Sequence, residues 1–111
     1  MGTFNFEALY ESLKAGVEST AKDTVHQYLD QAKADGYKAV DAMKDSLQRW
    51  AQELEDQQLT LDELGFLVEE EKDLNEMIAL KQAGMAEVQI DTFKNSLYNM
   101  VLGTVLNFVK I

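Results

Sequence analysis

The chain has 111 residues, which is enough for one domain spanning 1–111, and its 20 Asp and Glu against 10 Lys and Arg give a formal net charge of −10. It contains no Cys, which excludes disulfides, cysteine zinc sites and thiol nucleophiles. The negative charge opposes contact with nucleic-acid phosphates, so we expect no direct nucleic-acid partner.

The start of the chain shows no basic region followed by an apolar run, so no secretory signal is visible. The most apolar stretch, 93–111, is interrupted by five Lys and Asn residues, whereas a membrane-spanning helix needs about 20 largely apolar ones. These five residues are Lys94, Asn95, Asn99, Asn107 and Lys110. We therefore expect a cytoplasmic protein without a transmembrane segment, although the pattern leaves peripheral contact with lipid open.

A long apolar stripe in the N-terminal half predicts a single helix over about 5–57, with Asn5 as its N-cap. The stripe has a mean step of about 3.7 residues, and the predicted helix would be about 80 Å long. A break at Gly36, which would give a four-helix bundle, is the alternative. The stripe keeps its phase across Gly36, which favours one continuous helix. Small residues in this stripe predict that another helix approaches closely: Ala21, Ala32, Gly36 and Ala39.

The second predicted helix spans about 61–82, and both of its ends carry local signals. Thr60-Leu61-Asp62-Glu63 matches a capping box. Gly84 suits the left-handed position of a Schellman ending in which Met85 meets Leu80.

A third helix is expected over about 92–109, with Asp91 as its cap. The predicted fold is therefore all-α: a long N-terminal helix forms an antiparallel hairpin with two shorter helices.

The acidic residues gather in one part of the chain. Residues 53–76 hold ten acids and one base, whereas residues 92–111 hold two Lys and no acid. A solvated surface that keeps the protein soluble is one interpretation, and a docking surface for a basic protein partner is the other. The docking candidates are Glu63, Glu69, Glu70, Glu71, Asp73 and Glu76.

The third helix carries apolar residues around most of its circumference, which is typical of a helix buried on several sides. One long partner helix would not cover all these sides, so we expect a homo-oligomer or a subunit of a protein assembly. The interface candidates are Phe93, Leu97, Met100, Val101, Leu102, Val105, Leu106, Phe108 and Val109.

Signals for chemistry are weak. Asp23 and His26 have the acid-x-x-His spacing of diiron four-helix proteins, which makes a ferritin-like metal oxidase one hypothesis. Both residues fall at the margin of the apolar stripe, however, whereas metal ligands should project inward. Phosphate-binding loops, dinucleotide turns and calcium loops are absent. We therefore expect no catalytic residue, no metal and no cofactor, and hence no enzyme.

Together these patterns predict a non-enzymatic structural, scaffold or adaptor subunit that acts by self-assembly or protein–protein interaction through its apolar C-terminal helix. An acidic inhibitor or nucleic-acid mimic that binds a basic partner is the first alternative. The near 11-residue period is similar to that of lipid-surface helices such as those of apolipoproteins and granule-coating proteins. A lipid- or granule-surface protein is therefore a further alternative.

Overall fold

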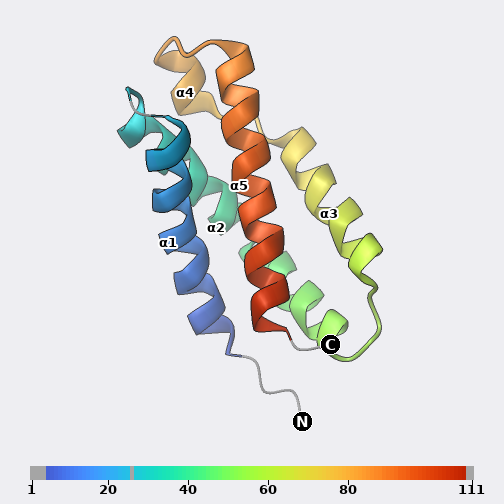
Figure 1. The fold of residues 1–111 in the computed structure, drawn as a ribbon. Helices are drawn as coiled ribbons and strands as arrows, with labels where there is room; N and C mark the ends of the chain where they lie inside the picture. The colour runs from blue at the N-terminus through green and yellow to red at the C-terminus, as the bar shows by residue number, and fades with distance from the viewer. Residues whose placement is uncertain (1–4, 26, 110–111) are drawn as a thin grey trace.

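Five helices make up the part of the chain that the computed structural model describes, residues 5–25 and 27–109. They are α1 (Phe6–Thr24), α2 (Leu29–Glu55), α3 (Leu61–Leu74), α4 (Ile78–Gln82) and α5 (Glu87–Phe108). The four longer helices run alternately up and down, and α4 lies in the connection between α3 and α5 (Figure 1). The predicted all-α fold is confirmed.

The prediction of one helix over 5–57 is wrong, because the chain turns back between α1 and α2. The bundle measures 47 × 23 × 19 Å, so a helix of about 80 Å would extend far beyond it. Folding back places the apolar stripe of α1 against that of α2, and Val25 at the turn is buried. The stripe keeps its phase through this turn, so its periodicity gives no sign of the break.

The alternative of a four-helix bundle is right in its architecture but wrong in the position of the break, since Gly36 lies inside α2 and is buried there. The prediction of a close helix approach in this region is confirmed. A Cβ atom built on Gly36 would lie only 2.5 Å from Cγ1 of Val17 in α1. Glycine therefore allows the backbone of α2 to contact a side chain of α1 at short range.

The capping box at the start of α3 is confirmed. The side-chain oxygen of Thr60 accepts a hydrogen bond from the Glu63 amide at 3.1 Å, and the Glu63 carboxylate accepts one from the Thr60 amide at 2.9 Å. This reciprocal pair satisfies two amides that a helix leaves unpaired at its N-terminus.

The helix expected over 61–82 is interrupted after Leu74, so this prediction is wrong in its extent. The side-chain oxygen of Asn75 accepts a hydrogen bond from the Met77 amide at 3.0 Å, which closes a local turn in place of the next helical bond. Met77 takes a left-handed backbone conformation with φ of 51°. The chain changes direction here before α4 begins.

The predicted Schellman ending follows α4 and is confirmed. Gly84 has a φ of 91°, and the Met85 amide donates a hydrogen bond to the Leu80 carbonyl at 3.2 Å. The next helix starts at Glu87, earlier than the predicted 92, so Asp91 lies inside α5 and does not cap it. Burial of Ile90 ties this added first turn to the core.

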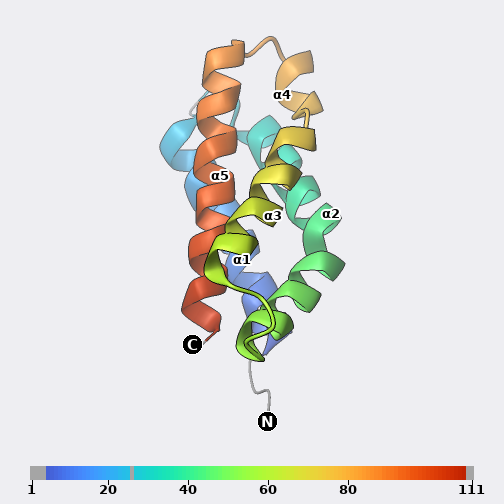
Figure 2. The same ribbon diagram turned by 90° about the vertical axis from the view of Figure 1, so that its right-hand side faces the viewer.

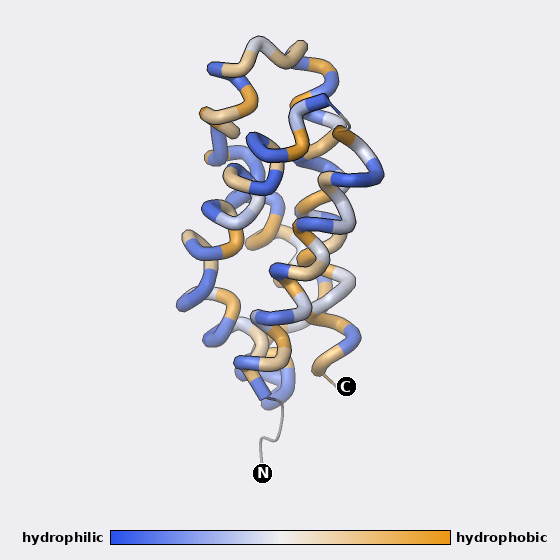
Figure 3. The backbone as a smooth tube through the Cα atoms, turned by 90° about the vertical axis from the view of Figure 1, so that its left-hand side faces the viewer, coloured by the Kyte–Doolittle hydropathy of each residue, from blue (hydrophilic) through white to orange (hydrophobic). Residues whose placement is uncertain are grey.

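α5 has packing partners on several sides within the chain, because the turn between α1 and α2 supplies more of them than one long helix would. It packs most extensively against α1, then against α3, with further contacts to α2 and α4. Figure 2 shows α3 and α5 side by side in front of α1. Figure 3 shows hydrophobic and hydrophilic residues alternating along the helices, as expected for amphipathic helices around a shared core.

Candidate binding groove

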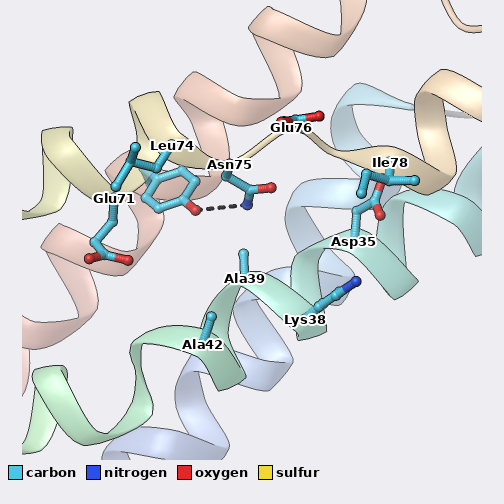
Figure 4. Close-up of a pocket in the computed structure, with 10 residues that line it drawn as sticks. Asp35, Lys38, Ala39, Ala42, Glu71, Leu74, Asn75, Glu76 and Ile78 are labelled. Carbon is cyan, nitrogen blue, oxygen red and sulfur yellow. Dashed lines mark hydrogen bonds between the residues drawn. The ribbon is translucent and has the colours of Figure 1, made fainter.

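A groove of about 360 Å³ lies where α2 faces the end of α3 and the start of α4 (Figure 4). Leu74 and Ile78 are large apolar side chains on its rim, and they are 78% and 48% exposed. Such exposure shows that the groove is open to solvent. The lining residues are Asp35, Lys38, Ala39, Ala42, Glu71, Leu74, Asn75, Glu76, Ile78 and Tyr98.

Asp35 of α2 holds α4 in place at one end of the groove. Its side chain is only 6% exposed, and its two carboxylate oxygens accept hydrogen bonds from the amides of Ala79 at 3.0 Å and Leu80 at 2.8 Å. Met77, the residue at the N-cap position of α4, provides no side-chain cap. Asp35 therefore caps α4 from another helix, and its negative charge suits the positive end of that helix.

Asn75 and Tyr98 line the groove and are hydrogen-bonded to each other. The Asn75 amide nitrogen donates to the Tyr98 hydroxyl at 2.8 Å, while its oxygen accepts from the Met77 amide. Burial raises the pKa of Tyr98, and the hydrogen bond from Asn75 opposes that rise. The phenol is therefore neutral at physiological pH. Its oxygen accepts the hydrogen bond from Asn75, which fixes the ring against the turn after α3.

Carboxylates dominate the α3 side of the groove. Glu76 is exposed and Glu71 half-buried, whereas Lys38 on the α2 side is the single basic residue of the lining. The remaining predicted docking candidates also lie along α3, and all four are exposed: Glu63, Glu69, Glu70 and Asp73. The structure thus places the six candidates on α3 and the turn that follows it.

Exposed apolar side chains share this acidic region. Among the described residues, six large hydrophobic side chains are exposed, and four of them belong to α3 and α4. These four are Leu61, Phe66, Leu74 and Ile78. Phe66 is 73% exposed. We call α3 and α4 together, with these side chains and the acids between them, the α3–α4 surface.

Most of the predicted interface residues on the C-terminal helix are buried or half-buried within the chain itself, and self-assembly through this helix stays a prediction. Five of the nine candidates are buried in the chain's own core: Phe93, Leu97, Val101, Val105 and Val109. Met100, Leu102 and Phe108 are half-buried, and Leu106 alone is exposed. α1 and α3 cover the sides of α5 that the prediction assigned to another protein.

A polar cluster joins the outer faces of α1 and α2, away from the groove. Tyr10 donates a hydrogen bond to Asp41, and Tyr37 donates one to Glu18 at 2.7 Å. The bond to Asp41, with some burial and the nearby negative charge, raises the pKa of Tyr10 to about 12. The bond from Tyr37, helped by Lys33, lowers the pKa of Glu18. These contacts tie the two helices together.

Within residues 5–25 and 27–109, no group of three His, Asp or Glu side chains is placed to hold an ion. The metal-oxidase hypothesis depends on His26, which lies outside the described residues. None of the helices that the structure describes combines the length and apolar character needed to cross a bilayer.

The chain matches no protein-family model, no curated protein and no solved structure, so its function has to be inferred from its own residues.

Proposed function

We propose that this protein is a non-enzymatic adaptor that binds a basic protein partner through the α3–α4 surface. The observation that supports this proposal is the placement of three exposed apolar side chains within the most acidic segment of the chain, residues 53–76, with Ile78 just after it. An apolar group at the centre of a polar, charged surface is the usual composition of a protein–protein interface.

The two components of the surface have different physical roles. Its carboxylates attract a positively charged partner over about a Debye length and speed the encounter. Phe66 then supplies the affinity, since burial of a phenylalanine side chain contributes about 1.5–3 kcal/mol and aromatic anchors dominate many interfaces. The carboxylates alone would keep this surface solvated. Exposed apolar side chains add nothing to solubility, so their presence favours a binding role.

Affinity capture from the native lysate, with quantitative identification of the captured proteins, tests this proposal. We expect a basic protein that is retained by the parent chain and by Val88→Gln, and lost with Phe66→Gln. Val88 is a matched control, because its side chain is 77% exposed and lies at the start of α5. If no protein distinguishes Phe66→Gln from Val88→Gln, the proposal is wrong.

A further inference from the structure

We infer that the groove between α2 and the α3–α4 surface binds one amphipathic, basic helix of the partner protein. This inference rests on the proposed function. It specifies the secondary structure and charge of the bound partner segment and the place where that segment binds. Three properties of the groove indicate what binds there: its shape, the charge of its walls and the exposure of its rim.

The shape of the groove suits a helix. Ala39 and Ala42 are one turn apart on α2, and in Figure 4 their short side chains project toward the α3–α4 side without filling the space between. Small residues on one helix allow a second helix to approach closely, because interaxial distances of about 8–10 Å depend on the side chains at the contact. The rim adds Leu74 and Ile78, which a helix with an apolar stripe would cover.

The charge of the groove walls indicates which charged residues the bound helix carries. Glu71 and Glu76 on the α3 side have no basic neighbour among the lining residues except Lys38 on the opposite wall. Asp35 is already occupied by the amides of α4. A matching helix therefore carries Lys or Arg on the flank that faces α3 and an apolar stripe toward the alanines. A second copy of this chain fits poorly, because each copy carries a net charge of −10.

The exposure of the rim argues for a macromolecular occupant. Sites for small molecules enclose about 70–90% of their ligand, whereas Leu74 and Ile78 stand largely in solvent. A helix laid along the groove would bury both and would leave its own polar face in water, as in other helix-in-groove complexes.

The test uses the whole protein and two designed peptides of identical composition. The first, of about 18 residues, has Leu at positions i, i+3, i+4 and i+7 and Lys on one flank; the second is a scrambled sequence without an apolar face. Fluorescence anisotropy at low salt gives the Kd of each labelled peptide, and circular dichroism gives its helicity. We expect the amphipathic peptide to bind at least tenfold more tightly and to gain helicity when bound.

Two substitutions at exposed groove positions locate the bound peptide. Leu74→Gln removes the apolar rim, and Ala42→Phe fills the floor without changing the charge. Each should raise the Kd about tenfold, which corresponds to about 1.4 kcal/mol. Matched controls outside the groove are Val88→Gln on α5 and Ala15→Phe on α1, and these should change the Kd less than twofold.

The possible results separate the two proposals. If the peptide binds with a dependence on Phe66, which lies outside the groove, but not on Leu74 or Ala42, the groove inference is wrong and the α3–α4 surface keeps its role. Equal binding of both peptides likewise overturns the inference, because it shows attraction by charge alone. If neither peptide binds at low salt, the groove inference and the proposed basic partner both fail.

Discussion

Alanine at Gly36 should destabilise the protein, although alanine normally improves a helix. The added Cβ atom would lie 2.5 Å from Cγ1 of Val17, at least 1 Å inside an ordinary carbon–carbon contact. Valine is held in one strongly preferred rotamer within a helix, so Val17 gains little by rotating and α1 must move away from α2. Overpacking of this kind lowers the free energy of unfolding by about 1–3 kcal/mol, whereas the higher helix propensity of alanine raises it by about 1 kcal/mol.

Gly65 and Gly103 provide the matched controls. Both lie inside helices, and a Cβ atom added to either has no neighbouring heavy atom within 4 Å. Gly65→Ala and Gly103→Ala should therefore each stabilise the fold by about 1 kcal/mol. Since the propensity gain is common to all three substitutions, the difference between Gly36→Ala and the controls isolates the steric cost. That difference should be about 1–3 kcal/mol.

Urea unfolding followed by the fluorescence of Trp50, the single tryptophan and a buried one, measures these free energies. Combining Val17→Ala with Gly36→Ala tests the cause, because removal of the valine methyls should make the alanine at position 36 much less costly. If Gly36→Ala stabilises as much as the two control variants, the close contact between α1 and α2 does not exist as described.

Three further results are expected. Asp35→Ala should lower the free energy of unfolding by about 2–4 kcal/mol in urea titration, because two α4 amides lose a charged acceptor, and Asp35→Asn should cost less. Thr60→Ala should cost about 1 kcal/mol by the same measurement, through loss of the N-cap. Tyr10 should titrate near pH 12 when its ring signals are followed by NMR, and Asp41→Asn should bring its pKa back toward 10.0. Because the folded pKa of Tyr10 is the higher one, its contribution to stability is complete below pH 10 and is lost as pH rises toward 12.

Each of these results has a clear contrary outcome. A loss below about 1 kcal/mol for Asp35→Ala would show that α4 does not depend on its cap from α2. Unchanged unfolding of Thr60→Ala would place the start of α3 elsewhere. A Tyr10 titration that does not respond to Asp41→Asn would remove the hydrogen bond as the cause of the raised pKa.

Helix ends with their own local chemistry could be predicted from the sequence, and the others could not. The capping box at Thr60 and the glycine at 84 act through hydrogen bonds to residues within five positions, so short-range patterns suffice. The turn after Thr24 has no proline or glycine and leaves the apolar stripe in phase. It exists because two antiparallel helices bury more apolar surface than one extended helix, which is a property of the whole bundle.

Some features of the candidate site could likewise be predicted from the sequence, and others could not. The acidic character of α3 follows directly from composition, and the structure keeps it at the surface. The groove depends on the interruption at Asn75, which brings Leu74 and Ile78 to its rim. The sequence does contain a sign of the role of Asp35. Its carboxylate lies on the same face of the helix as Ala32 and Ala39, which are buried, and a buried carboxylate needs a hydrogen-bond partner. Its partner is 44 residues away, beyond the reach of any local pattern.

The cap that Asp35 gives to α4 also sets an order of folding. A helix of five residues does not form by itself, because nucleation costs more than so few hydrogen bonds return. We therefore expect α4 to form only as it docks on α2, through hydrogen bonds between residues 44 and 45 positions apart. Burial of Leu80 and packing on α2 also hold α4, so we expect loss of the Asp35 carboxylate to loosen the α4 end of this segment first. Opening there would widen the groove without unfolding the bundle that frames it.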